Sequence, residues 1–270
     1  MGNLSFTILG CGSSGGVPRL GGNWGDCDPN NSKNQRSRCS LLVELTGTEG
    51  VTKVLIDTSP DMRSQLLKVN VGKLDGVVYS HEHADHVHGI DDLRMIFFNM
   101  RRRINVWADL KTQEALYQKF GYTFIQPKGS PYPPILKMST IDSQFSIQGE
   151  GGEITFNPFD VQHGTITSLG FRISDVTYIP DISEMNDNAW DQIKKTNIWI
   201  LDALRRTPHQ SHTHLNQSLE WIEKSGVKKG ILTNMHIDMD YETLTNELPN
   251  NVEPAFDGMK IMSKSTAIKE

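Results

Sequence analysis

Residues 76–86 read GVVYSHEHADH, a short run of β-type residues that ends in the cluster H-x-H-x-D-H. Alternate residues of an extended chain point to the same side, so the side chains of His81 and His83 are predicted to lie together. Asp85 and His86 follow where the chain is expected to turn. Because the chain holds nine histidines among 270 residues, this spacing is rare by chance, and a solvated polar turn is the less favoured interpretation.

Imidazole and carboxylate groups are ligands that suit Zn²⁺, and also Mn²⁺ or Fe²⁺. The cluster contains no cysteine, which favours a catalytic metal centre with a position for water over a closed structural site. Four such ligands can serve two adjacent ions. The cluster therefore predicts two divalent metal ions, zinc or manganese, as cofactors.

Further acidic and histidine residues stand alone elsewhere in the chain, each at the predicted end of a strand. Asp57 follows the run VLI, and Asp181 follows the run TYIP. His163 precedes a glycine, and His236 comes shortly after the run ILT. These residues follow the H-x-H-x-D-H cluster or precede it in a fixed order along the chain, and this order is the basis of a family resemblance.

Together with the H-x-H-x-D-H cluster, these residues resemble those of the metallo-β-lactamase superfamily, and the resemblance spans nearly the whole chain. It implies an α+β fold, a four-layer αββα sandwich with a dinuclear metal site at one edge of its two sheets. It also implies the metal ligands, which are His81, His83, Asp85, His86, His163, Asp181 and His236. Asp57 and Asn234 would support these ligands from behind.

The last ligand has two candidates. Related enzymes usually place this histidine directly after Leu-Thr, where this chain has Asn234, and His236 comes two residues later. Residues i and i+2 of a strand share a face, so His236 is the predicted ligand. Whether Asn234 takes its place instead stays open at this point.

Within the superfamily the chain resembles most closely the phosphodiesterase branch, which includes tRNA 3′-processing endonucleases and a phosphoribosyl cyclic phosphodiesterase. The opening loop, LGCGSSGGVP at residues 9–18, is similar to the glycine-rich first loop of that branch. His212 looks like the additional histidine that protonates the leaving oxygen there, and a histidine pKa near 6.5 suits this role. The predicted catalytic residues are therefore His212 and Asp85, whereas a plain solvent contact is the alternative for His212.

The predicted substrate is a small cyclic phosphodiester or a nucleotide, attacked by water that two metal ions activate. Predicted substrate contacts are His214, Arg19, Arg94 and Ser14, since guanidinium groups bind anions with two hydrogen bonds. RNA is less favoured, because the formal charge is −5 and Arg101 begins a run of only three arginines. The alternatives are a thioester or other acyl hydrolase of the same superfamily and a non-catalytic nucleotide-binding module.

Two other motifs occur in the opening loop. Residues 10–15 match G-x-G-x-x-G, the dinucleotide-binding pattern, and residues 12–16 match G-x-S-x-G, which would make Ser14 a nucleophile. Both mechanisms need a helix directly afterwards. Residues 17–22 read VPRLGG, which is unsuited to starting a helix, so a glycine-rich turn is the favoured interpretation.

The pattern of β-branched and apolar residues predicts ten strands, at residues 5–9, 40–45, 54–56, 76–79, 104–107, 154–159, 169–173, 176–179, 198–201 and 230–232. Helices are predicted after Ser59, the expected N-cap, and at residues 110–120, 183–195, 215–222 and 239–247. The apolar residues 95–100 are interpreted as core, with a homodimer contact as the alternative. One domain over residues 1–270 is expected.

Composition restricts the class of protein. Hydrophobic residues make up 37 % and charged residues 22 %, which is a globular balance without an apolar run that could span a membrane. The N-terminus lacks the features of an export signal, and three cysteines leave an odd thiol. We therefore expect a cytoplasmic protein without disulfides and without a membrane partner.

Overall fold

The computed structural model describes residues 2–263, which form two mixed β-sheets of seven strands each. The first sheet has the order β14-β1-β2-β3-β4-β5-β6, and its strands are β1 (Asn3–Gly10), β2 (Ser40–Thr46), β3 (Val51–Ile56), β4 (Gly76–Val78), β5 (Ile104–Ala108), β6 (Leu136–Thr140) and β14 (Met259–Met262). The second sheet has the order β13-β12-β11-β10-β9-β8-β7, and its strands are β7 (Phe145–Gly149), β8 (Gly152–His163), β9 (Ile166–Ile173), β10 (Val176–Ile179), β11 (Ile198–Asp202), β12 (Lys229–Thr233) and β13 (Val252–Pro254).

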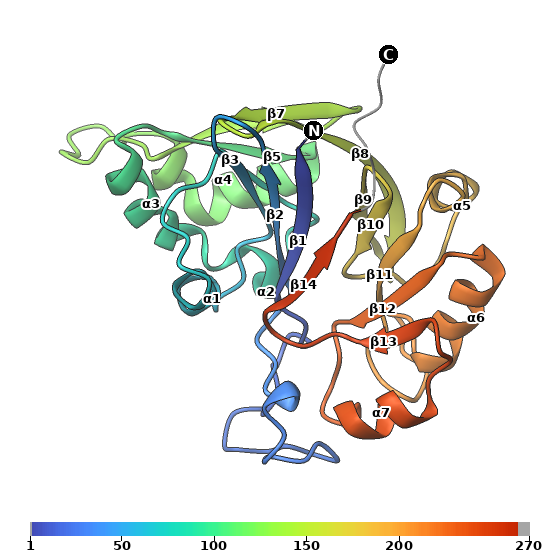
Figure 1. Cartoon of the computed structure of the whole chain (residues 1–270). Helices are drawn as coiled ribbons and strands as arrows, with labels where there is room; N and C mark the ends of the chain where they lie inside the picture. Colours follow the sequence, from blue (N-terminus) through green and yellow to red (C-terminus); the bar gives the residue numbers. More distant parts are fainter. Residues whose placement is uncertain (1, 264–270) are drawn as a thin grey trace.

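Helices cover the outer face of each sheet (Figure 1). Those over the first sheet are α1 (Met62–Lys68), α2 (Ala84–Val87), α3 (Leu93–Met100) and α4 (Leu110–Phe124). Those over the second sheet are α5 (Asp187–Ile193), α6 (Leu215–Ser225) and α7 (Tyr241–Glu247). The layers therefore follow the order αββα, which confirms the predicted α+β sandwich.

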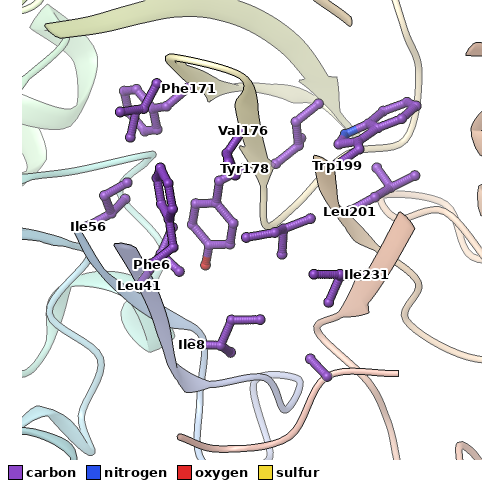
Figure 2. Packing of buried hydrophobic residues seen from close by; sticks show 14 of the residues in the cluster. Phe6, Ile8, Leu41, Ile56, Phe171, Val176, Tyr178, Trp199, Leu201 and Ile231 are labelled. Atoms are coloured by element: carbon purple, nitrogen blue, oxygen red, sulfur yellow. The ribbon is translucent and has the colours of Figure 1, made fainter. Parts of the chain in front are cut away.

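Alternation along the strands divides the core into two parts. In β2, Leu41 and Val43 point toward the second sheet, whereas Leu42 between them points toward the helices of the first. Figure 2 shows Phe6 and Leu41 of the first sheet facing Phe171 and Tyr178 of the second. Because the strands are buried on both faces, their sequences are nearly continuous apolar runs, which is why they were predictable.

All ten predicted strands are present, and the structure adds β6, β7, β13 and β14. These four are short edge or near-edge strands with weak patterns, and β13 ends in proline. The structure also adds α3, in which Ile96 is buried while Met95 and Phe98 are exposed. The interpretation of residues 95–100 as core thus holds for one face of this helix.

The start of α1 differs from the prediction. The helix begins at Met62 with Asp61 as its N-cap, so Pro60 lies before the helix and Ser59 is not the cap. The Asp61 side chain makes no capping hydrogen bond, because its carboxylate binds the Arg38 guanidinium at 2.6 and 2.8 Å. Ser59 still contributes to the start of the helix, because its Oγ accepts from the Asp61 amide at 3.2 Å.

The glycine-rich segment after β1 forms an irregular loop, drawn in blue at the foot of Figure 1, rather than the start of a helix. Gly10 is required there, since a Cβ at this position would lie 2.1 Å from the Arg38 carbonyl oxygen. The loop returns alongside β12, where the Ser13 amide donates to the Met235 carbonyl at 3.1 Å. This geometry excludes both mechanisms that need a helix directly after the loop.

Topology brings several strand ends to one edge of the sandwich. Strands β3 and β4 run parallel in the first sheet, and β10, β11 and β12 run parallel in the second. Strand β8 runs in the same direction as β10, because both pair antiparallel with β9. The carboxyl ends of parallel strands are the usual place for a site in such sheets. Within residues 2–263, no helix has the length and apolar character needed to cross a membrane.

Candidate metal centre

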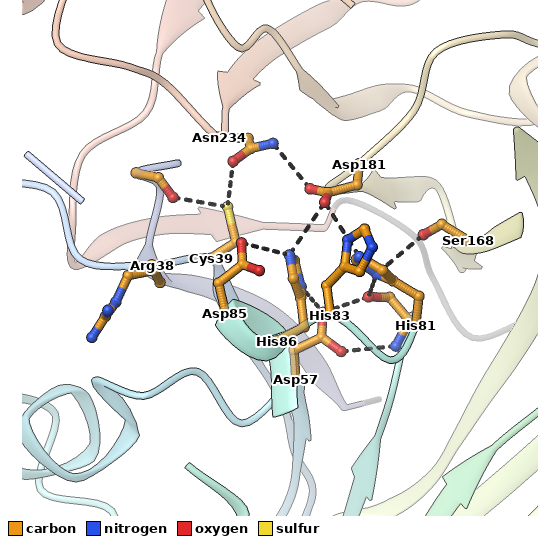
Figure 3. Close-up of polar contacts among 12 residues, drawn as sticks. Arg38, Cys39, Asp57, His81, His83, Asp85, His86, Ser168, Asp181 and Asn234 are labelled. Carbon is orange, nitrogen blue, oxygen red and sulfur yellow. Dashed lines mark hydrogen bonds and ion pairs between the residues drawn. The ribbon is translucent and has the colours of Figure 1, made fainter. Parts of the chain in front are cut away.

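Four ligand-type side chains from three separate segments meet at this edge, and Figure 3 shows three of them, His81, His83 and Asp181. His81 and His83 follow β4, His163 ends β8, and Asp181 follows β10. One ligand atom from each lies within 4.8 Å of those of the other three. Residues 81 and 83 are thus joined to residues 163 and 181, which lie 80 or more positions further along the chain.

A hydrogen bond at the ring nitrogen that faces away from the centre fixes the tautomer and the orientation of the His163 imidazole. His163 Nδ1 donates to the Ser211 carbonyl at 2.5 Å, so its Nε2, 3.5 Å from Oδ2 of Asp181, keeps a lone pair when the ring is neutral. Burial lowers the pKa of His163 to about 4, which keeps the ring neutral at physiological pH. A neutral imidazole with its other nitrogen hydrogen-bonded is the form that binds metal ions.

A second group of donors lies on the other side of Asp181. His86, the last residue of the motif, lies in the short helix α2 and is fully buried. Its Nε2 lies 3.4 Å from Oδ2 of Asp181 and 3.5 Å from Oδ2 of Asp85. His86 Nδ1 donates to Asp57 Oδ2 at 2.8 Å. Asp57 also accepts from the amide and hydroxyl of Ser80, so it supports His86 from behind.

Two buried nitrogens at the centre have no hydrogen-bond partner. They are Nε2 of His81 and Nε2 of His86, and both face the same oxygen, Oδ2 of Asp181, at 3.3 and 3.4 Å. An unpartnered buried nitrogen is costly, and a metal ion would remove that cost by accepting the lone pair. The donor set therefore fits divalent metal ions, with His and Asp as their ligands.

Protonation opposes metal binding at His86. Burial acts to lower its pKa, but the carboxylates of Asp181, Asp85 and Asp57 outweigh burial and hold it well above the usual value. A metal ion bound at Nε2 has to displace this proton, so affinity at this position should increase with pH.

A further acidic residue, Asp202 at the end of β11, was not among the predicted site residues. Its carboxylate is fully buried and accepts a 2.8 Å hydrogen bond from Nδ1 of His212. It also accepts from the Ile182 amide at 3.1 Å, and its backbone carbonyl accepts from Thr213 and Ser218. The available signal was an aspartate directly after an apolar strand, the same pattern that identified Asp57 and Asp181.

The structure separates the two candidates for the last ligand. Asn234 is buried and donates from Nδ2 to Oδ1 of Asp181 at 3.0 Å. His236 instead contacts Arg19 through Nε2 and lies 3.4 Å from Asp238 through Nδ1. Asn234, which directly follows β12, has a φ of 60°, outside the extended region, so the alternation of a strand does not apply to residues 234 and 236. The prediction that His236 reaches the metal ion assumed that the strand continues through residue 236, whereas β12 ends at Thr233.

A cavity of about 360 Å³ opens beside the centre. Among the predicted substrate contacts, Ser14 and Arg19 line it, together with His212 and His236. The other two do not: Arg94 pairs with Asp91 on an exposed part of the surface, and His214 is the N-cap residue of α6. Arg205, one of the arginines considered for binding a substrate anion, also lines the cavity. The lining residues that were not predicted are Ser13, Leu204, His209 and Ser211.

Residues 52–237 match the beta-lactamase superfamily domain, which is more than half of the chain. The chain belongs to this superfamily. A crystal structure of a diphosphatase from the PhnP family is 31 % identical and has a TM-score of 0.84, covering 96 % of this chain and 97 % of that one. These similarities confirm the predicted resemblance to the phosphodiesterase branch of the superfamily.

Two other proteins are similar to this chain, one in fold and one in sequence. Human short-form tRNase Z has a TM-score of 0.64 with 15 % identity, covering 95 % of this chain and 98 % of that one, so it shares the fold. A Porphyromonas gingivalis protein named octanoyltransferase is 29 % identical over 267 residues, which are 97 % of this chain and 52 % of that protein. This chain therefore spans about half the length of that curated relative.

Proposed function

We propose that this chain is a phosphodiesterase that uses two divalent metal ions to hydrolyse a small cyclic phosphodiester or a nucleotide. The observation that carries the proposal is the pair of unpartnered nitrogens, on His81 and His86, that both face the same oxygen of Asp181. A carboxylate oxygen between two such nitrogens is suited to bridging two ions. The first ion would take His81, His83 and His163, and the second would take Asp85 and His86, with Asp181 shared.

Divalent ions bound there would hold the phosphate oxygens and lower the pKa of water. Asp85 lies beside them, and although burial acts to raise its pKa, the neighbouring His86 lowers it, so the carboxylate is ionised and accepts a hydrogen bond from the attacking water. Asp181 and the three histidines of the first position would hold the ion that binds the phosphate beside the cavity wall. The chain thereby holds both reactants in one orientation before the bond to phosphorus forms.

His212 completes the reaction from the opposite side of the cavity. Its Nδ1 is held by Asp202, which leaves Nε2 free to point at the leaving oxygen. Protonated His212 donates its proton to that oxygen as the phosphorus–oxygen bond breaks. The Asp202 carboxylate stabilises the protonated ring and keeps the tautomer fixed, as the buried aspartate of a hydrolase triad does for its histidine.

The shape and charge of the cavity support a small anionic substrate. Its volume is that of a single nucleotide-sized ligand, and Arg19 and Arg205 lie at its wall. Two of the three arginines that could have contacted RNA have other partners, because Arg103 donates to the Leu136 and Phe124 carbonyls and Arg102 pairs with Asp75. A polynucleotide is therefore the less favoured substrate.

Acyl hydrolysis is the second candidate, because one relative is named for octanoyl transfer. The match covers 97 % of this chain but only 52 % of that relative. An octanoyl group needs an apolar groove, whereas the cavity is lined mostly by histidine, arginine, serine and acidic side chains, with Leu204 as its one aliphatic residue. The chemistry of the wall thus favours a phosphate ester over a fatty acyl ester.

The test compares three substrates on one metal-loaded preparation: bis(4-nitrophenyl) phosphate, a 2′,3′-cyclic nucleotide and an octanoyl thioester, each with Mn²⁺ or Zn²⁺. We expect turnover of the first two. Cleavage of the thioester alone would establish the acyl hydrolase instead. Full metal occupancy with tight nucleotide binding and no turnover of any substrate would establish the non-catalytic module.

A further inference from the structure

The two metal positions differ in the number of side chains that serve them. The first has three imidazoles and a shared carboxylate, all with ligand atoms within 4.8 Å of one another. The second has Asp85, His86 and the shared Asp181. In place of a further histidine at this position the chain has Asn234, so the role of this amide decides whether the two positions are equivalent.

The side-chain amide of Asn234 faces the centre with its NH₂ group, which donates hydrogen bonds and cannot bind a metal ion. Its Nδ2 lies 3.0 Å from Oδ1 of Asp181 and 3.2 Å from Oδ1 of Asp202. Ionised carboxylates only accept hydrogen bonds, so the NH₂ end has to face these two oxygens. The amide oxygen then points the other way, toward Sγ of Cys39 at 3.9 Å (Figure 3).

His236 does not supply the missing ligand. Its amide donates to the Leu204 carbonyl at 2.8 Å, and its ring contacts Arg19 and Asp238 at the cavity wall. Among residues 2–263, two groups have ligand atoms within 4.8 Å of one another: His81, His83, His163 and Asp181 form one, and Asp181, Asp202 and His212 form the other. His236 and Cys39 belong to neither group, and Asp85 and His86 reach Asp181 through the 3.4 and 3.5 Å contacts of His86 Nε2. The second position therefore has one imidazole and two carboxylates from the protein, and water has to complete it.

We propose that the two positions fill in sequence, the first tightly and the second only at much higher free metal, because Asn234 joins Asp181 to Asp202 instead of binding an ion. This inference rests on the proposed two-metal function. Losing even an outer partner of a ligand costs about 10–100-fold in affinity, so we expect the two dissociation constants to differ by at least about 100-fold. The oxygen-rich second position also favours Mn²⁺ relative to the first, which is rich in imidazole.

The experiment measures bound metal, not turnover. The whole chain is stripped with a chelator and dialysed against a series of buffered free Mn²⁺ concentrations, and protein-bound manganese is determined by mass spectrometry. We expect two separate steps of one equivalent each. A single step of two equivalents in the wild-type chain would overturn the proposal, and this result needs no variant to fold.

Three variants locate the cause. Asn234→His should move the second step to at least about tenfold lower free metal. Asn234→Ala should shift both steps together, because Asp181, the residue it orients, belongs to both positions; loss of the second step alone would show that the amide is a ligand and would overturn the proposal. His236→Ala should leave both steps in place, and loss of the second step would identify His236 as the ligand. Bound manganese is measured independently of turnover. A chain that cleaves no phosphodiester yet binds manganese in two separate steps would therefore refute the proposed function and leave this inference intact.

Discussion

Nδ1 of His212 lies 2.8 Å from Oδ2 of Asp202, and the carboxylate is fully buried at the end of β11. Burial acts to lower the pKa of His212, but the charges of Asp202 and Asp181 outweigh it and raise the pKa to about 9. Burial also raises the pKa of Asp202 to about 6, against the opposing effect of His212. At neutral pH the pair is therefore an imidazolium held by a carboxylate, the form that a general acid requires.

The first prediction concerns the pH dependence of turnover. A general acid acts only while protonated, so kcat should fall as pH rises past about 9, and His212→Gln should lower kcat by about 10²–10⁴-fold and remove this decline. Asp202→Asn removes the charge that raises the pKa, so the decline should move to lower pH. The measurement is a pH–rate profile at saturating substrate and Mn²⁺.

Metal content serves as the control for these variants. In the proposed ligand assignment His212 donates a proton and holds no ion, so bound manganese should match the wild-type value when His212→Gln is compared at equal free metal. An unchanged alkaline decline in His212→Gln, or a parallel loss of metal and activity, would exclude the proton-donor role.

The second prediction concerns Asp57, which holds His86 at 2.8 Å and has a φ of 63°. Asp57→Ala should weaken metal binding by about 10–100-fold, because His86 loses the acceptor that fixes its tautomer and ring orientation. The matched control is Asp75→Asn. Asp75 directly precedes β4, at the end of that strand away from the metal centre, and its carboxylate accepts from the amide of Lys53 in β3. Equal metal affinities in the two variants would show that Asp57 has no part in the centre.

Much of this arrangement was predictable from the sequence, and the reason lies in the strands. Buried strands produce apolar runs, and a polar residue that ends such a run, such as Asp57 or Asp181, stands out against them. The H-x-H-x-D-H spacing adds a local pattern that needs no knowledge of the rest of the chain. The αββα layers, in contrast, were expected from the family resemblance, because periodicity alone leaves the topology open.

Other features depend on contacts between distant residues, and these escaped prediction. The position of residue 236 depends on a left-handed turn at Asn234, which a pattern assuming a continuous strand does not contain. Asp202 gains its role from His212 ten residues later, across a loop whose path is set by tertiary packing. Arg94 was selected for its charge alone, and charge does not distinguish a cavity wall from an exposed pair with Asp91.

The third prediction concerns Arg36, a buried cation that ties the opening loop to the segment after β12. Its Nη2 donates to the Met239 carbonyl at 2.7 Å and to Oδ1 of Asn34 at 3.3 Å. Arg36→Met keeps much of the side-chain volume but removes both hydrogen bonds, so the free energy of unfolding should fall by about 2–3 kcal/mol. Urea denaturation measures this loss. Arg63→Met, at an exposed position of α1, should change stability by less than about 0.5 kcal/mol, and a similar loss in both would refute the role of burial.

The fourth prediction concerns the pH dependence of stability at Asp240, the N-cap of α7. One carboxylate oxygen accepts from the amide and hydroxyl of Thr243, and the other accepts from the Asp28 amide and from Asn34 Nδ2 at 2.7 Å. Burial acts to raise the pKa of Asp240, but these donors outweigh it and lower the pKa to about 2. Ionised Asp240 therefore joins α7 to the opening loop.

A folded-state pKa below the unfolded value, near 3.9, stabilises the fold above pH 4, and this contribution is lost as pH falls toward 2. In Asp240→Asn the amide oxygen can still cap Thr243, but the NH₂ group faces the Asp28 and Asn34 donors, so we expect a loss of about 1–2 kcal/mol at pH 7. The difference from wild type should narrow between pH 4 and pH 3 in urea titrations. Glu242→Gln, in the exposed first turn of the same helix, is the control, and a pH-independent difference for Asp240→Asn would show that the charge of Asp240 contributes nothing.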